Sequence, residues 1–513
     1  MTRAAPALDR SSTGAAFARV ADRRPDAIAL RWESVDGPRA LTYAELSRHA
    51  HGAAAALSAR VAPGERIAIW SANCPEWIVA QLAAALAGAV LVPLNPALTE
   101  DEAAFVVDSA GARIVLAGPE WRGRDLAASA RRLVVGGAAV EVLALVEWAA
   151  EVADARAPLP VVGADDPAYI QYTSGTTGTP KGAVLSHRVT TNVGPLSHRA
   201  LGLTEQDVVC SPLPFHHVGG SVCTVLATLL RGGTFVLLPG FDAAQTLATL
   251  GGHDVTFFGG VPTMMIAMLE LGGDRTPDLP ALRRVMVGGS TVAPELITRI
   301  ERAFGVEVFN GYGQSEAPSA LQTRAGDPAE VKALTIGRPD EHREVSIRDP
   351  LSGAEVPAGA VGELCLRGPL TMDGYWEERD GTCSSAFDED GWLHTGDVAS
   401  RDEDGVVTLH GRLRDVIIRG GENVYPAEVE AVLATHPSVA EVAVVAAPDP
   451  FWGEVPAAFV RAAAPFDPVE LEAFARQRLA SFKVPRIWRE IDAFPVTASG
   501  KVQKFRLAEL LRR

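Results

Sequence analysis

The feature that most constrains the fold is a repeated alternation of short apolar strands with helices. Five apolar segments between positions 207 and 313 each end close to a glycine or a proline: DVVCSPL, GTFVLLPG, DVTFFGG, RRVMVGG and VEVFNGYG. Helical stretches at Ala243–Leu250, Pro262–Leu271 and Ala293–Phe304 separate several of them. This rhythm predicts a parallel sheet with helices on both faces. Ligands of such sheets bind beyond the carboxyl ends of the strands, so we expect a site at these loops.

The N-terminal part of the chain shows the same alternation. Thr42 and Thr99 each open a sequence typical of a capping box, which predicts that a helix follows each of them. The apolar run Trp77–Leu94 approaches the length of a membrane span, but a glutamine, a glycine and a proline interrupt it. It therefore predicts a buried helix followed by a buried strand. Buried strands are expected at Arg66–Trp70, Ala89–Leu94 and Arg113–Gly118.

The pattern changes in the last third of the chain. Between Gly337 and Arg412, the segments VSIRD, GELCLRG and VVTLHGR predict a small antiparallel β unit. After Arg412 we expect a helix, two strands and a second helix, with the helices at Ala427–Thr435 and Pro468–Leu479. About 100 residues suffice for a separate domain. The expected fold class is α/β: a large N-terminal domain of doubly wound, mostly parallel sheets with a small β unit, and a small C-terminal α+β domain.

Charge and cysteine content narrow the range of partners. The chain has 47 Lys and Arg against 63 Asp and Glu, a net charge of −16. This balance argues against nucleic acids and anionic membranes as partners, because both need a basic face. The five cysteines are odd in number and form no CxxC pair, which argues against a disulfide framework or a cysteine zinc site. Free thiols and the lack of an apolar leader indicate a cytoplasmic protein.

The strongest chemical signal is the string YTSGTTGTPKG, from Tyr172 to Gly182. Its glycines let backbone N–H groups converge on an anion, its hydroxyls can donate to phosphate oxygens, and its lysine adds a positive charge. The string predicts a loop for the phosphates of a nucleotide. It is not a Walker A loop, because no Ser or Thr follows the lysine. The expected ligands are Thr173, Ser174, Gly175, Thr176, Thr177, Gly178, Thr179 and Lys181.

This string resembles the signature of the AMP-forming adenylate superfamily, which comprises acyl-CoA synthetases, carrier-protein adenylation domains and luciferases. Six further motifs occur in the order of that family. They are PLPFHH (212–217), VGGST (287–291), NGYGQSE (310–316), GWLHTGD (391–397), GRLRDVIIRGGENVYPAEVE (411–430) and PVTASGKVQK (495–504). Their number and order make the resemblance highly specific and extend it over most of the chain.

The motif around Tyr312 makes chemical sense by itself. Tyr312 can stack on a purine, Ser315 can bind the α-phosphate, and Glu316 offers the carboxylate that Mg²⁺ prefers. Taken alone, the segment could also be a simple turn after a strand. The resemblance adds Asp397 and Arg412 as ligands of the ribose. It implies that ATP and AMP contact Gly289, Ser290, Asn310, Gly311, Tyr312, Gly313, Gln314, Ser315, Asp397, Arg412 and Lys501.

Catalysis is expected to rest on charge and position, because a carboxylate is ionised at neutral pH and needs no base. The resemblance implies that Lys501 stabilises the charge that develops on the α-phosphate. Glu316 and Thr173 are the expected ligands of Mg²⁺, which enters with ATP. The residues expected to take part in catalysis are Lys501, Glu316, Ser315, Lys181 and His216.

The acyl pocket is expected beside the PLPFHH motif. In the family, a histidine or an aromatic residue at this place lines the pocket near the carboxylate. The alternative for His216 is a structural histidine in a loop, and a metal site is disfavoured because no further His or Cys cluster lies nearby in sequence. The glycines leave room for an acid larger than acetate. The expected pocket comprises His216, His217, Val218, Phe258, Gly259, Gly288, Gly311 and Gly313.

The resemblance also implies a second conformation, because the lysine of the first step lies on the domain that must later admit a thiol. The C-terminal domain is expected to be mobile and to turn about Arg414. This hinge divides an N-terminal AMP-binding domain, residues 1–413, from a C-terminal domain, residues 414–513. The expected CoA-binding residues are Gly420, Gly421 and Glu422.

The predicted function is that of an ATP-dependent carboxylate–CoA ligase, which forms an acyl-AMP with release of pyrophosphate and then transfers the acyl group to CoA. The alternatives are a stand-alone enzyme that passes the adenylate to a carrier protein or another nucleophile, and a nucleotide-binding protein without ligase activity. The expected partners are a carboxylic acid, ATP and CoA, with a homodimer as one option and without nucleic acid or membrane association. The acid is left open between medium-chain fatty, aromatic and dicarboxylic acids.

Overall fold

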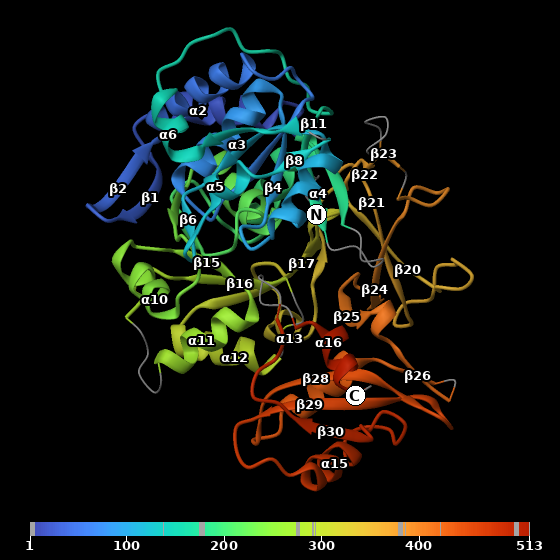
Figure 1. Ribbon diagram of the computed structural model, residues 1–513. Coiled ribbons are helices and arrows are strands. Elements are labelled where there is room, and N and C mark those ends of the chain that lie inside the picture. Colours follow the sequence, from blue (N-terminus) through green and yellow to red (C-terminus); the bar gives the residue numbers. More distant parts are fainter. Residues whose placement is uncertain are drawn as a thin grey trace.

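Two large sheets and their helices form most of the molecule, and the C-terminal residues form a smaller unit at the bottom of the view in the computed structural model (Figure 1). The structure describes residues 6–136, 138–173, 180–272, 278–289, 292, 294–377, 383–384, 386–420, 422–496 and 502–511.

One large sheet has nine strands. They are β1 Ile28–Ser34, β2 Gly37–Thr42, β13 Val208–Ser211, β14 Thr234–Leu237, β15 Phe257–Gly260, β16 Arg284–Gly288, β17 Glu307–Gln314, β18 Ala317–Gln322 and β19 Arg338–Pro339. Their order is β19-β18-β17-β16-β15-β13-β14-β1-β2. The six strands from β17 to β1 run parallel, and the strands at both edges are antiparallel to their neighbours. The segments after β13, β15, β16 and β17 therefore meet at one edge of this sheet.

The other large sheet has eight strands. They are β3 Arg66–Trp70, β4 Val90–Leu94, β5 Ala112–Ala117, β10 Glu141–Ala144, β11 Pro167–Thr173, β12 Lys181–Ser186, β22 Gly374–Trp376 and β23 Cys383–Ser384. Their order is β10-β5-β3-β4-β11-β12-β22-β23, parallel from β10 to β11 and antiparallel beyond. The strands β11 and β12 flank the segment predicted to bind phosphates.

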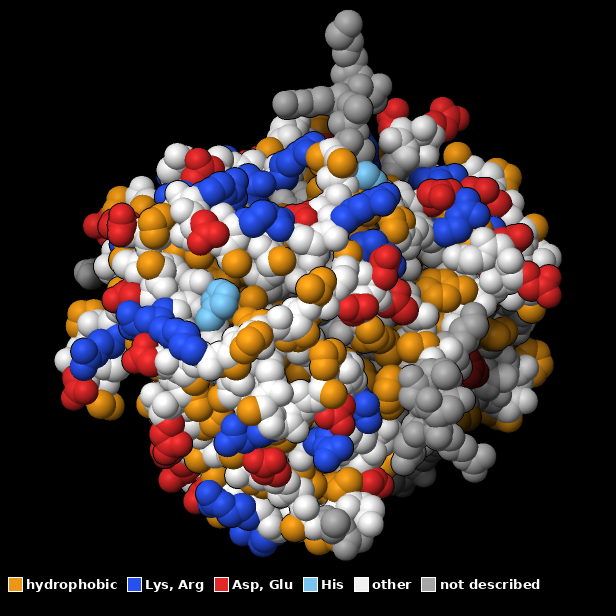
Figure 2. Space-filling model, turned by 90° about the horizontal axis from the view of Figure 1, so that it is seen from above, with side chains coloured by type: hydrophobic (Ala, Val, Ile, Leu, Met, Phe, Trp, Pro, Cys, Tyr) orange, Lys and Arg blue, Asp and Glu red, His pale blue; other side chains and the backbone are white. Residues whose placement is uncertain are grey.

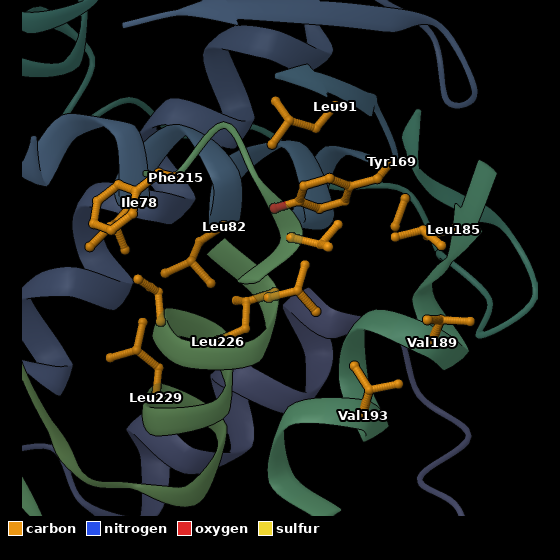
Figure 3. Close-up of a cluster of buried hydrophobic side chains, with 14 of the residues drawn as sticks. Ile78, Leu82, Leu91, Tyr169, Leu185, Val189, Val193, Phe215, Leu226 and Leu229 are labelled. Carbon is orange, nitrogen blue, oxygen red and sulfur yellow. The ribbon is translucent and has the colours of Figure 1, made fainter. Parts of the chain in front are cut away.

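Helices cover both sheets and join them through a common core. They are α1 Thr13–Arg23, α2 Tyr43–Ser58, α3 Pro75–Ala87, α4 Glu100–Ala110, α5 Leu126–Ala130, α6 Leu145–Glu151, α7 His187–Ala200, α8 Val218–Gly220, α9 Ala227–Arg231, α10 Ala243–Gly252, α11 Pro262–Gly272, α12 Pro294–Phe304 and α13 Ala329–Leu334, with a π-helical segment at Ser221–Leu226. In Figure 3, side chains of α3, α7 and α9 meet those of β4, β11 and β12. Their burial supplies the main driving force that holds the two sheets together.

Two smaller antiparallel sheets complete the fold. The first comprises β20 Glu344–Arg348, β21 Val361–Arg367, β24 Leu393–Arg401 and β25 Val407–Arg412. The second comprises β26 Ile417–Arg419, β27 Glu422–Val424, β28 Val439–Asp449, β29 Gly453–Ala462 and β30 Ile487–Glu490, with the helices α14 Pro426–Ala434, α15 Pro468–Arg476 and α16 Lys504–Leu510. In this second sheet only β30 runs parallel to its neighbour. Two short ribbons pair β6 Glu120–Trp121 with β7 Arg124–Asp125, and β8 Val134–Val135 with β9 Ala138–Ala139.

The predicted α/β class and most predicted elements are confirmed. Thr42 and Thr99 both close capping boxes, and the run Trp77–Leu94 forms the buried α3 and β4. Among the described residues, no helix is long and apolar enough to cross a membrane. All five cysteines are free thiols. Acidic and basic side chains are interspersed over the face seen in Figure 2.

Three features of the sheets were not predicted. The pairs β11–β12 and β17–β18 are antiparallel hairpin-like extensions of otherwise parallel sheets. The short strands β22 and β23 lie in the segment predicted as a separate β unit, yet they join the eight-stranded sheet. These three departures all fall near the motifs, and they decide which motif residues come together.

Candidate active site

The motif NGYGQSE lies where the parallel part of the nine-stranded sheet ends. Asn310 to Gln314 form the last residues of β17, and Ser315 and Glu316 make the turn into β18. Asn310 is buried, and its Nδ2 donates to the carbonyl oxygen of Thr335 at 2.9 Å. This hydrogen bond engages the Nδ2 donor of Asn310 within the protein.

Tyr312, Asp397 and Arg412 are bonded to one another at this edge. The Tyr312 hydroxyl donates to Asp397 Oδ2 at 2.5 Å, and Arg412 Nε lies 2.8 Å from Asp397 Oδ1. Gln314 Nε2 donates to the same tyrosine hydroxyl at 3.1 Å. Burial, reinforced by the negative charge of Asp397, raises the pKa of Tyr312 well above its usual value, so this phenol stays protonated. The structure thus joins four residues that were predicted separately as nucleotide ligands.

The pairing of β24 with β25 explains why Asp397 meets Arg412, because the two residues occupy facing positions. Asp397 is 3% exposed, whereas the Arg412 side chain is 42% exposed and can meet a ligand. Next to Asp397, the N–H of Gly396 donates to Glu363 Oε1 at 3.0 Å. Glu363 Oε2 lies 2.8 Å from His394 Nδ1, and this bond holds the pKa of His394 above its usual value. A buried carboxylate therefore steadies the turn that presents Asp397.

This supporting group also holds the one set of potential metal ligands among the described residues. Glu363, Cys365 and His394 place ligand atoms within 4.8 Å of one another. Both ring nitrogens of His394 are engaged, however, because Nε2 lies 3.4 Å from Asp388 Oδ2 and Nδ1 faces Glu363. Burial raises the pKa of the Cys365 thiol to about 12, which disfavours the thiolate that metals bind. The set is better described as a cluster of ion pairs.

Lys181, Tyr375 and Glu316 form a second group. The Tyr375 hydroxyl donates to Glu316 Oε1 at 2.9 Å, and Lys181 Nζ lies 5.1 Å from the centre of the Tyr375 ring. Burial, with the negative charge of Glu316, raises the pKa of Tyr375, so the hydroxyl remains a donor. Sequence reasoning missed Tyr375, because no motif contains it. Only the pairing of β22 with β12 brings this ring between two predicted site residues.

Of the predicted phosphate loop, only the two ends are described. Thr173 and Lys181 face each other in the β11–β12 pair, with Thr173 Oγ1 3.5 Å from the carbonyl oxygen of Lys181. Residues 174–179 lie outside the described part of the chain, and so do Ser290, Gly421 and Lys501.

The described residues nearest Lys501 in sequence are firmly connected. Val496 and Val502 form a β-bridge, and the N–H of Gln503 donates to the carbonyl oxygen of Pro495 at 2.7 Å. Lys504 Nζ lies 2.6 Å from Glu430 Oε1 of α14. The same carboxylate oxygen accepts the N–H of Val444 in β28 at 2.7 Å.

His216 is a buried, uncharged histidine. Its loop is held by Asn73, whose Oδ1 accepts the N–H of Phe215 at 2.8 Å and whose Nδ2 donates to the carbonyl oxygen of Leu213 at 3.0 Å. Burial and the neighbouring His217 hold the pKa of His216 well below its usual value. The two rings are tilted against each other with centres 4.4 Å apart. His216 Nε2 has no hydrogen-bond partner within the described structure.

The other residues predicted for the acyl pocket lie on neighbouring strand ends. Gly259, Gly288 and Gly311 belong to the adjacent strands β15, β16 and β17, and Val218 begins α8 after the histidines. A Cβ on Gly288 would lie 2.6 Å from the carbonyl oxygen of Gly311, so the close approach of these strands requires that glycine. Phe258 is fully buried in the apolar cluster beneath α11 and α12. Gly289 follows β16, and Gly313 lies near the end of β17.

The residues predicted for the hinge and for CoA lie between β25 and α14. Arg414 is in a single 3₁₀ turn, Leu413–Asp415, and its side chain is exposed. Gly420 has φ +59°, and a Cβ there would lie 2.6 Å from the Trp452 ring. Packing against Trp452 within the chain therefore requires glycine at position 420, independently of CoA. Glu422 is exposed at the start of β27.

A further group near the site was missed by sequence reasoning. Asp340 and Arg343 are 4% and 6% exposed, and burial raises the pKa of Asp340 to about 7. Asp340 Oδ2 and the Nε and Nη1 atoms of Arg343 have no hydrogen-bond partner in the described part of the chain. The sequence signal was the departure GRPDEHR after Gly337, where charged residues replace the small turn that the family resemblance implies.

Comparisons with known proteins agree with this geometry. The family model described as AMP-binding enzyme matches residues 17–376, and the model described as AMP-binding enzyme C-terminal domain matches residues 428–501. A feruloyl-CoA synthase of an Amycolatopsis species is 40% identical over 494 residues, which cover 95% of this chain and 96% of the relative.

Two solved structures extend the likeness to the fold. ATP-bound MatB from Rhodopseudomonas palustris has a TM-score of 0.86 and 31% identity, and the match covers 97% of this chain and 99% of that one. The anthranilate CoA ligase AuaEII in complex with anthranoyl-AMP has a TM-score of 0.87 and 26% identity, with 99% and 98% covered.

Proposed function

We propose a role for each site residue, on the premise that this chain belongs to the AMP-binding enzyme family and is an AMP-forming acyl-CoA synthetase. The enzyme couples a carboxylic acid to ATP as an acyl-adenylate, releases pyrophosphate and joins the acyl group to CoA. The observation that carries the assignment of roles is the bonded group Tyr312–Asp397–Arg412.

This bonded group is proposed to hold the nucleoside of ATP. The Asp397 carboxylate is proposed to accept the ribose hydroxyls, since a carboxylate offers about four acceptor sites. Arg412 balances its charge and is exposed enough to reach a ribose oxygen. Tyr312, fixed through its hydroxyl, presents its ring to the adenine. Because these side chains brace one another, little ordering remains to be done when ATP binds.

Lys181, Glu316 and the segment 173–179 are proposed to receive the phosphates, with Ser315 as a donor to the α-phosphate. Glu316 suits Mg²⁺, because its carboxylate accepts a bond from the neutral Tyr375 and forms no ion pair with a described Lys or Arg. A magnesium ion bound there together with Thr173 would neutralise charge on the phosphates. Tyr375 positions this carboxylate and keeps Lys181 from pairing with it directly.

Lys501 is proposed to stabilise the charge that grows on the α-phosphate as the carboxylate attacks the phosphorus. As the new P–O bond forms, the bond from the α-phosphorus to the oxygen that joins the α- and β-phosphates breaks, and pyrophosphate leaves with that oxygen. The carboxylate is already ionised, so positioning supplies the remainder of the rate. His216 is neutral, and we propose that it lines the acyl pocket as a hydrogen-bonding wall.

The two steps are proposed to use two orientations of the C-terminal residues. The boundary lies between residues 413 and 414, at the single turn that carries Arg414. In the second orientation the thiol of CoA attacks the acyl carbon near Gly420, Gly421 and Glu422, and AMP leaves. CoA is the acceptor, and a carrier protein is the competitor to test. A homodimer and a cytoplasmic location, the latter supported by five free thiols, also stay proposals.

The test is pyrophosphate release from Mg·ATP over a panel of aromatic, medium-chain and dicarboxylic acids, with and without CoA, followed by mass analysis of the products. We expect pyrophosphate that depends on the acid and an acyl-CoA product. Pyrophosphate with a bound adenylate but no acyl-CoA would move the acceptor to a carrier protein. A lack of acid-dependent pyrophosphate would refute the proposal.

The two-orientation scheme makes opposite predictions for two variants. Lys501→Ala should lower adenylate formation by about 10³-fold and spare thioester formation from supplied acyl-adenylate. Gly421→Leu should do the reverse by obstructing the thiol. Both half-reactions are followed separately by pyrophosphate release and by acyl-CoA formation. Equal losses in both half-reactions for either variant would contradict the scheme.

A further inference from the structure

Asp340 and Arg343 are fastened to the backbone that runs on from Glu316. Arg343 Nη2 donates to the carbonyl oxygens of Pro318 at 2.6 Å and of Leu370 at 2.9 Å. The N–H of Asp340 donates to the carbonyl oxygen of Ala320 at 3.0 Å. Both side chains therefore sit against β18, directly after the turn that carries Glu316.

The π-helical segment that follows the histidines lies on the other side of these side chains. Cys223 belongs to that segment, and the charges of Arg343 and Asp340 both act on its buried thiol. The preceding helix α8, which begins after His217, packs against β18. Asp340 and Arg343 thus lie between the strand that leads from Glu316 and the helix that leads from His216. His217 and Val218, which are predicted for the acyl pocket, lie at the start of that helix.

The unused bonding capacity of this pair has a definite pattern. Two nitrogens of Arg343, Nε and Nη1, and one oxygen of Asp340, Oδ2, lack partners. No ion pair joins the two side chains within the described residues, although each is more than nine-tenths buried. Buried polar atoms in native proteins are nearly always satisfied by protein, water or ligand. The pair therefore offers donors and an acceptor to a small polar group.

We propose that Asp340 and Arg343 bind an uncharged hydroxyl at the far end of the carboxylic acid, which makes hydroxylated acids the preferred substrate class. This inference rests on the proposed function. A hydroxyl can accept from Arg343 and donate to Asp340 at once, whereas a methyl group satisfies neither. Above its pKa of about 7, Asp340 is negatively charged, so a second carboxylate would meet a like charge there. The expected order of preference is thus hydroxylated acid, then unsubstituted acid, then dicarboxylic acid.

The first measurement is kcat/KM for matched pairs of acids, in the complete enzyme with Mg·ATP and CoA. Each pair consists of an aromatic or medium-chain acid with and without a terminal hydroxyl. For one pair of fitting length we expect a preference of roughly 10- to 100-fold for the hydroxylated acid. Turnover of the unsubstituted acids alone would leave the proposed function intact and overturn this inference.

Two variants test the residues themselves. Arg343→Met keeps the length of the side chain but removes its donors, so the ratio of kcat/KM within the best pair should fall to near one. Asp340→Asn removes the negative charge, so dicarboxylic acids should gain roughly 10-fold relative to hydroxylated acids. If Arg343→Met does not fold, the Asp340→Asn result decides by itself.

The matched control is Arg231→Met on α9. Arg231 also donates to a backbone carbonyl, that of Leu203 at 2.6 Å, and its Nε also lacks a partner. We expect this control to lower thermal stability and to leave the substrate ratio unchanged. An unchanged ratio in Arg343→Met, with lowered stability alone, would mean that the pair merely holds buried water, and it would overturn the proposal.

Discussion

The nucleotide side and the acyl side of this site are built in opposite ways. On the nucleotide side, Tyr312, Asp397 and Arg412 bond to one another, and Tyr375 bonds to Glu316. On the proposed acyl side, His216, Asp340 and Arg343 are buried, yet each has a polar atom without a partner in the described structure. The nucleotide is the same in every turnover, so its ligands can satisfy one another beforehand. The acid differs between enzymes, so its recognition groups are left for the substrate to satisfy.

The largest effect is expected from Asp397→Ala, which breaks the closed group at its centre. Arg412 and Tyr312 lose their shared partner, and a hydrogen bond to a charged group such as that from Tyr312 to Asp397 contributes about 1.5–3 kcal/mol. We expect kcat/KM for Mg·ATP to fall by about 10²- to 10³-fold, by the same factor for every acid. ATP–pyrophosphate exchange measures this loss. If the loss in kcat/KM differed from one acid to another, the nucleotide side and the acyl side would not be independent. Asp397→Asn keeps an acceptor for Tyr312 and should lose less.

A smaller loss is expected from Tyr375→Phe, which removes one hydrogen bond to Glu316 and keeps the ring under Lys181. We expect kcat/KM for ATP to fall by about 10-fold, as for one lost bond to a charged group. The loss should be greatest at low Mg²⁺, so it appears as a shifted magnesium titration. Tyr43→Phe also deletes a buried phenol bond, to Leu229 and Gly233, but far from Glu316. Tyr43→Phe should lower stability and leave the magnesium titration unchanged. If both variants shifted the magnesium titration, this would argue against a positioning role for Tyr375.

The smallest effect is expected from His394→Gln, which loosens the support behind Asp397. The pKa of His394 is raised in the folded protein, chiefly by its bond to Glu363. Its stabilising contribution is therefore complete below the unfolded pKa of about 6.5 and is lost as pH rises through the folded pKa. For this part-exposed pair we expect about 0.5 kcal/mol, seen as a lower Tm of the variant in acid, and this difference disappears as pH rises past the folded pKa. A loss that grows with pH would have the wrong sign.

Most of the framework was predictable because it follows from periodicity and capping. Neighbouring residues alone predict the structure of the run Trp77–Leu94 and of the capping boxes at Thr42 and Thr99. These local patterns keep the predicted structure in the folded protein. The glycine-rich ends of β15, β16 and β17 were likewise readable, because parallel strands must end at one edge.

What was missed depends on pairings between distant segments. Tyr375 meets Glu316 because β22 pairs with β12, a contact that no local pattern encodes. Asp340 and Arg343 belong to no predicted motif, but both are buried and both are hydrogen-bonded to backbone carbonyls of β18. Asp, Glu, His and Arg follow one another after Pro339, and such residues are usually solvated. Their exception here is visible only once the strand order is known.

The bridge between Val496 and Val502 limits how Lys501 can travel. With the two ends of its segment fastened to each other, and Lys504 tied to Glu430 of α14, the base of that segment cannot part from the C-terminal sheet. The described segment that follows Lys501 in sequence is thus tied through Glu430 to α14 and β28. In the proposed two-orientation scheme, rotation at the turn around Arg414 moves this segment toward the nucleotide or away from it. A change in that turn should therefore alter the timing of both half-reactions together.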